Sequence, residues 1–76
     1  MRITYDPEAD AAYIQLAKTI GAGGVDFTFA CDPNAVDGMI HLDFDAQGVL
    51  LGIEVLAART TLPPEVLQEA VRPGGE

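Results

Sequence analysis

The strictest pattern in this chain is an alternation of apolar and polar residues on both sides of the segment Asp45-Ala46-Gln47-Gly48. Apolar residues occupy every second position from 40 to 44, and again from 51 to 55. A period of two is typical of a half-buried β-strand, and Asp and Gly between two such runs favour a tight turn. The pattern predicts a β-hairpin with strands at about 39–45 and 49–56.

The same alternation restricts how the two strands pair. A slip of one residue would move the whole apolar row to the opposite face of the sheet. Phe44 is therefore expected opposite Val49 across a two-residue loop, or opposite Leu51 across a four-residue loop, and never opposite Leu50. Both of these registers keep the apolar residues facing one another.

The rest of the chain predicts a small antiparallel sheet and one helix. Further strands are expected at about 2–5, 11–17 and 25–31, the last with Val25, Phe27, Phe29 and Cys31 as its inward row. After Arg59, Thr60 and Thr61 offer a cap, and Pro63 and Pro64 suit a first helical turn. This predicts a helix at about 63–71 and a tail at 72–76. The expected fold is a single domain over 1–76 of the α+β class: an antiparallel β-meander of four to five strands with one short C-terminal helix.

Composition narrows the classes of partner. Twelve acidic and four basic residues give a formal net charge of -8, which opposes binding to nucleic acid and to anionic membranes but is compatible with a basic protein. No segment resembles a signal peptide or a membrane span, and Cys31 is the single cysteine, so we expect a cytoplasmic protein. A chain of 76 residues holds one thin core, worth only about 3–5 kcal/mol, and often gains stability from oligomerisation.

Two blocks of the sequence resemble a known family. The first block is Ile3-Thr4-Tyr5-Asp6-Pro7-Glu8-Ala9-Asp10-Ala11 followed by Tyr13-Ile14, and the second runs from Leu42-Asp43-Phe44-Asp45 through Gly48 to Leu51-Gly52-Ile53-Glu54-Val55-Leu56. Together they resemble the small bacterial family catalogued as domain of unknown function 2283, over about residues 1 to 57. The resemblance implies a compact β-meander with a helical end, and it implies no reaction, cofactor or catalytic residues. The Gly-rich loop and the connection at 31–37 depart from the family pattern.

The hairpin also matches the ligand spacing of a calcium-binding EF-hand loop. Asp43, Asp45 and Glu54 would supply carboxylates, with Gln47 and Gly48 between them. An EF-hand loop is flanked by helices, whereas these flanks alternate with a period of two. Glu54 would also lie too far from the turn to close over a cation there. We interpret the run as turn chemistry and assign no metal ligands.

A second motif is the set His41, Asp43 and Glu54 on the outward face of the hairpin. In the four-residue-loop register His41 lies directly opposite Glu54. A small metal-dependent or acid/base enzyme using these three residues is one hypothesis, and it requires a cleft. The alternative is a surface cross-strand pair contributing about 0.2–1 kcal/mol.

Two further features are interpreted structurally. Cys31 would be a nucleophile only beside cationic groups, and its neighbours are Asp32 and Phe29, so we expect a small core residue. The carboxylates of Asp6, Glu8 and Asp10 crowd one turn, an arrangement that suits a hard cation, but solvated turn carboxylates are far commoner and we interpret these as solvated.

These observations leave three hypotheses for function. The preferred one is a non-enzymatic protein-interaction module that acts as a homo-oligomer without a cofactor. Its basis is the apolar area expected from outward-facing Tyr13, Leu50 and Leu56, together with Ala11, Ala17 and Ala30. The others are an antitoxin-like partner of a small basic protein and the small enzyme described above.

Overall fold

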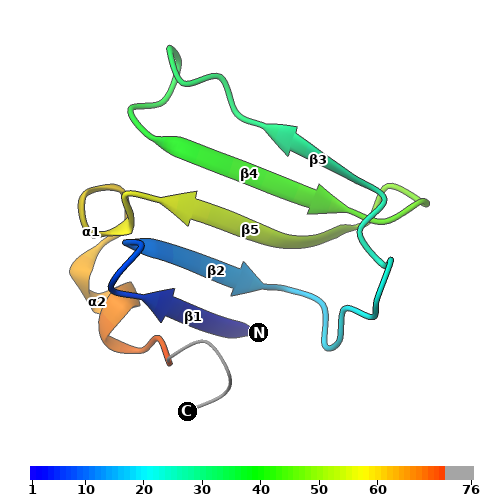
Figure 1. The fold of residues 1–76 in the computed structure, drawn as a ribbon, viewed down its shortest axis with the longest axis horizontal. Helices are drawn as coiled ribbons and strands as arrows, with labels where there is room; N and C mark the ends of the chain where they lie inside the picture. Colours follow the sequence, from blue (N-terminus) through cyan, green and yellow to red (C-terminus); the bar gives the residue numbers. More distant parts are fainter. Residues whose placement is uncertain (72–76) are drawn as a thin grey trace.

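A computed structural model describes residues 1–71 of the chain (Figure 1). The described part contains five strands followed by two short helices. The strands are β1 (Arg2–Asp6), β2 (Ala11–Gln15), β3 (Phe27–Ala30), β4 (Met39–Phe44) and β5 (Leu50–Leu56), and the helices are α1 (Ala58–Thr61) and α2 (Pro64–Gln68). The predicted tail at 72–76 lies outside the described residues.

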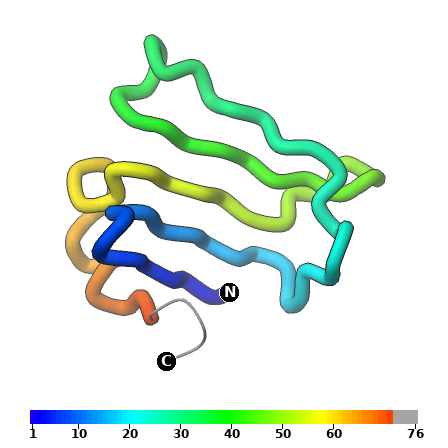
Figure 2. The backbone as a smooth tube through the Cα atoms, in the orientation of Figure 1, coloured from blue at the N-terminus to red at the C-terminus, as the bar shows by residue number. Residues whose placement is uncertain are grey.

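The strands form one antiparallel sheet in the order β1-β2-β5-β4-β3. The predicted α+β class with an antiparallel sheet is therefore confirmed. The order differs from that of a simple meander because β2 pairs with β5 instead of β3. The connection at 16–26 carries the chain past the ends of β5 and β4 to the far edge of the sheet (Figure 2). It must cross three strand spacings, about 14 Å, which is well within its reach.

The expected register at Phe44 is wrong. His41 pairs with Glu54 and Asp43 with Gly52, as in the longer-loop register, but Phe44 then pairs with Leu50 across a β-bulge. The cause is the turn, in which the Asp45 amide donates to the Val49 carbonyl at 3.0 Å and Gly48 adopts a φ of 83°. Pairing of Asp45 with Val49 leaves three residues in the loop. An odd number shifts the strand register by one residue relative to the expected two- or four-residue loop. The bulge absorbs the shift, so both apolar rows stay on one face.

The helical region begins earlier than expected and is divided in two. Thr60 and Thr61 lie inside α1 and do not cap the predicted helix. Pro64 opens α2, as its fixed φ favours, but α2 ends at Gln68. Val71 leaves the helix and pairs with β1, where its amide donates to Ile3 and its carbonyl accepts from Tyr5. The predicted single helix at 63–71 is thus corrected to a short helix and a bridge along the β1 edge.

The core lies at one end of one sheet face. Strand partners that lie directly opposite share a face, so the register defines an apolar face carrying Ile3, Tyr5, Ala12, Ile14, Phe27, Phe29, Ile40, Leu42, Phe44, Leu50, Ile53 and Val55. The buried cluster on it is Ala12, Val55 and Ala58, against which Leu62 and Leu67 also pack. The helices therefore cover the β1-β2-β5 side, and in Figure 1 no helix overlies β3 or β4.

Candidate functional site

The uncovered half of the apolar face carries an aromatic patch, which we define as Phe27, Phe29 and Phe44. Phe27 lies opposite Phe44, and their rings stack with centroids 5.0 Å apart and an interplanar angle of 12°. Phe27 is 49% exposed and Phe29 is 57% exposed. All four residues of β3 are exposed, so the prediction that its apolar row is half-buried is wrong. The helices are too short to reach this edge of the sheet.

The backbone of β3 forms an open edge beside this patch. The Cys31 amide donates to the Ile40 carbonyl at 2.8 Å, so the N–H group of Cys31 points toward β4. Since these directions alternate along a strand, Thr28 and Ala30 direct their N–H and C=O groups away from β4. Within residues 1–71 no strand pairs with this side of β3. The β3 edge thus combines unpaired peptide groups with exposed aromatic rings.

The opposite, polar face carries the residues of the predicted His/Asp/Glu cluster. His41 and Glu54 lie opposite each other, and His41 Nδ1 is 2.8 Å from Glu54 Oε1. Asp43 does not join them: its carboxylate accepts hydrogen bonds from Tyr13 Oη at 2.8 Å and Thr28 Oγ1 at 2.7 Å. No pocket lies among the described residues. The three side chains therefore form two separate surface contacts and do not converge on a point where a substrate could bind.

Tyr13 occupies the space beside Gly52 on this face. A Cβ atom at Gly52 would overlap the Tyr13 ring, so the missing side chain lets the ring lie flat across β5 toward Asp43. Burial, the hydrogen bond to Asp43 and the negative charges of Asp43 and Glu54 raise the pKa of Tyr13 to about 12. The outward tyrosine is thus a half-buried packing element and adds little exposed apolar area.

Replacing Gly52 with alanine should displace the Tyr13 ring. The new methyl group would occupy the position of the ring, and Tyr13 would lose both its burial and its bond to Asp43. We expect the pKa of Tyr13 to fall from about 12 toward its ordinary value of 10.0. Tyrosinate absorbance during an alkaline titration measures this change. A Gly21→Ala variant is the control, because open space surrounds Gly21. An unchanged Tyr13 titration in Gly52→Ala would contradict this account.

The run that resembles a calcium loop is a β-hairpin with its oxygens engaged locally. Asp45 Oδ1 accepts from the amides of Gln47 and Val49, both at 2.9 Å, and so closes the turn on itself. Asp43 and Glu54 point to the contacts described above. Within residues 1–71 no three His, Cys, Asp or Glu side chains are placed to hold one metal ion.

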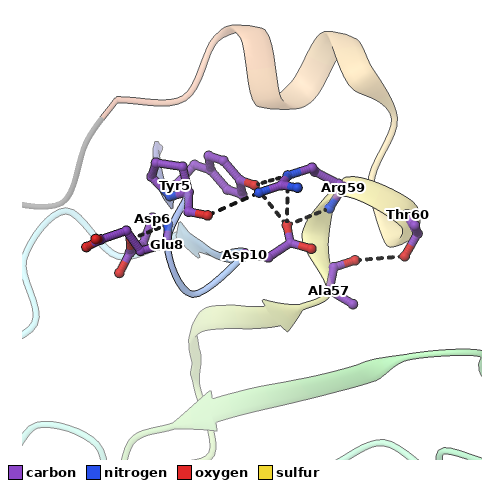
Figure 3. Close-up of polar contacts among 8 residues, drawn as sticks. Tyr5, Asp6, Glu8, Asp10, Ala57, Arg59 and Thr60 are labelled. Carbon is purple, nitrogen blue, oxygen red and sulfur yellow. Dashed lines mark hydrogen bonds and ion pairs between the residues drawn. The ribbon is translucent and has the colours of Figure 1, made fainter.

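A polar cluster that the sequence did not predict joins the β1-β2 turn to α1 (Figure 3). Asp10 Oδ1 accepts from Tyr5 Oη at 2.8 Å and from the Arg59 amide at 3.0 Å, which caps α1 from a distant segment. Arg59 Nε donates to Tyr5 Oη at 2.9 Å, and Arg59 Nη2 donates to the Pro7 carbonyl at 3.1 Å. Asp10 has a φ of 50°, a conformation that Asp and Asn tolerate better than most residues. The sequence pattern groups Asp10 with Asp6 and Glu8 as solvated turn residues, and this interpretation is wrong for Asp10.

The Asp10 carboxylate should make folding stability depend on acidity. The hydrogen bond from Tyr5, then the contacts of the Arg59 amide and side chain, hold the pKa of Asp10 below its ordinary value of 3.8. A lowered folded-state pKa gives stability that is present above the unfolded pKa and is lost as pH falls through the folded one. We expect Asp10→Asn, which tolerates the same backbone conformation, to reduce the loss of stability below about pH 4. Urea midpoints across this range measure it, with Glu8→Gln as the control. Equal acid dependence in wild type and Asp10→Asn would refute the prediction.

Comparison with known proteins places the chain in a family. A family model described as "Protein of unknown function (DUF2283)" matches residues 2–59. The chain belongs to the DUF2283 family. No curated protein and no solved structure matches it significantly. The family match spans the five strands of the described part of the DUF2283 chain and ends inside α1. The aromatic patch, the contacts of His41 and Asp43, and the Asp10–Arg59 cluster therefore lie within it.

Two remaining sequence expectations can be placed on the DUF2283 fold. Cys31 follows β3 and is half-buried beside Ile40, whose carbonyl accepts from its amide. In the described part, no helix has the length and apolar character needed to cross a membrane.

Proposed function

We propose that this DUF2283 protein is a non-enzymatic protein-interaction module that acts as a homo-oligomer through β3. The observation that carries the proposal is the exposure of Phe27 and Phe29 on a sheet half that no other element covers within residues 1–71. Small domains bury a sheet face against another element, and an aromatic side chain left half in water retains about 100 Å² of apolar surface. Covering that area would contribute about 2.5 kcal/mol for each ring.

The thin core supports the same proposal. Large side chains lie mostly at the margins of the core, and among the described residues Val55 is the largest that is fully buried. The chain measures 34 × 32 × 19 Å, which is the shape of a slab one sheet and one partial helical layer thick. Association of a second chain with the uncovered half would supply the missing layer or extend the sheet.

The polar face gives less support to an enzyme. A general acid/base pair acts on a bound substrate, and the His41–Glu54 contact lies on an open strand surface. Asp43, the third candidate, holds Tyr13 and Thr28 in place. A cross-strand pair of this kind forms one hydrogen bond and contributes modestly to strand pairing.

Light scattering coupled to size exclusion, over a range of micromolar concentrations, tests the proposal. We expect reversible association that strengthens with added salt, because copies carrying a formal charge of -8 repel each other and salt screens this repulsion. A complex with a basic protein would show the opposite salt dependence. A clean monomer at every concentration would count against self-association.

A further inference from the structure

We propose that two copies associate by antiparallel pairing of their β3 edges, with Phe27 of one copy opposite the partner's Phe29 and a two-fold axis at Thr28. This inference rests on the proposed function and adds the mode of contact and its register. It joins the two sheets into one continuous sheet and places the aromatic patches of the two copies side by side on the same face.

The two edges of the sheet differ in a way that selects β3. The β1 edge is covered by Val71, which exchanges hydrogen bonds with Ile3 and Tyr5. The β3 edge has no such cover within residues 1–71. Proteins usually protect an open edge with charged residues, proline or a bulge. A short edge strand is a further protection, and β3 has only four residues. Phe27–Ala30 nevertheless contains no charge, proline or bulge and presents two aromatic rings.

A second copy matches this edge because the edge is complementary to itself. The outward peptide groups of Thr28 match those of the partner's Thr28 in an antiparallel pair. Ala30 then lies opposite the partner's Asp26, whose amide already donates to the Phe44 carbonyl at 2.7 Å and takes no part in the pairing. Only registers that pair even-numbered residues with even-numbered ones keep both apolar faces on the same side. An isologous contact of this kind is closed, so it yields a dimer and not a fibre.

These registers differ in which charged and aromatic residues they place opposite each other. With the axis at Thr28, each Phe27 faces the partner's Phe29, and Asp26 faces the partner's Ala30. An axis at Phe29 would set Asp26 against the partner's Asp32, and like charges directly opposite are destabilising. An axis at Ala30 would leave both copies of Phe27 without an aromatic partner. The Thr28 register therefore gives two aromatic pairs and no opposed carboxylates.

The size of the contact predicts its strength. The four phenylalanine rings expose about 400 Å² in total, and rings that lie side by side on an open face bury only part of it. Together with the strand edges, the contact falls below the range of about 1,200–2,000 Å² for stable complexes. The dimer is accordingly reversible, and its population depends on concentration.

Cysteine cross-linking tests the register. In a Cys31→Ser background, Thr28→Cys places two thiols at the two-fold axis, within the Cα separation of about 4.4–6.8 Å that a disulfide requires. The matched control Ala30→Cys sits on the same edge and face, but its thiols would lie on the order of 13 Å apart. Circular dichroism establishes that both variants fold. Under mild oxidation near the association midpoint, we expect at least a tenfold faster disulfide dimerisation for Thr28→Cys.

The outcomes separate this inference from the proposed function. Faster cross-linking at Thr28→Cys supports the register. Equal or faster cross-linking at Ala30→Cys overturns it. A dimer in light scattering that cross-links at neither position overturns β3 pairing in this register and leaves self-association standing. If the Cys31→Ser parent is monomeric at all concentrations tested, the inference and the proposed function both fail.

Discussion

Replacing Val55 with alanine should lower the free energy of unfolding by about 2–3 kcal/mol, from the lost transfer energy of two methyl groups and the cavity they leave. Val55 is only 2% exposed and lies between Ala12 and Ala58 in the buried cluster. A core of this size provides about 3–5 kcal/mol in total, so the substitution removes most of the margin. Urea denaturation followed by circular dichroism measures the change.

Val49→Ala is the matched control, because it deletes the same atoms from a side chain that is 54% exposed. We expect an effect within about 0.5 kcal/mol there. Similar losses at both positions would show that Val55 does not form the centre of the core.

Replacing Phe27 and Phe29 together with serine should weaken self-association by about 100-fold or more. Truncating aromatic residues at the centre of an interface commonly costs at least 2 kcal/mol each. Both side chains are half exposed in the single chain, so the folded monomer should retain its sheet. Concentration-dependent light scattering measures the association, and circular dichroism reports on the fold.

Val36→Ser and Met39→Ser together form the control, since both residues are exposed apolar positions outside the aromatic patch. Their association should match that of wild type. Equal weakening by the control, or none by the phenylalanine variant, would argue that the patch is not the contact surface.

Local pattern predicted the strands well because each strand carries its own alternation. The hairpin around Gly48 and the pairing of His41 with Glu54 follow from residues close in sequence. The Phe44 register failed because alternation alone does not count loop residues, and a bulge can absorb an odd loop. Helix α1 was missed because its cap comes from Asp10, a residue in the β1-β2 turn.

The candidate surface illustrates a different limit. Phe27 and Phe29 alternate as core residues do, and alternation identifies a face without saying whether anything covers it. Coverage depends on where β3 lies in the sheet and on how far α1 and α2 reach. The aromatic patch therefore lies on the face expected to be inward. Tyr13, Leu50 and Leu56, which the sequence predicts to face outward, are all half-buried, and Leu50 lies opposite Phe44 on the apolar face.

The strand order also concentrates the chain-entropy cost of folding at one seam. The β1-β2 and β4-β5 pairs are hairpins whose ends meet over a few residues, whereas β2 and β5 are brought together from distant parts of the chain. Closing that long loop is the costly step, and contacts of high sequence separation slow folding. The hydrogen bond from the Arg59 amide to Asp10 spans 49 residues across the same seam. It therefore reinforces the β2-β5 pairing at the place where bringing distant segments together costs the most chain entropy.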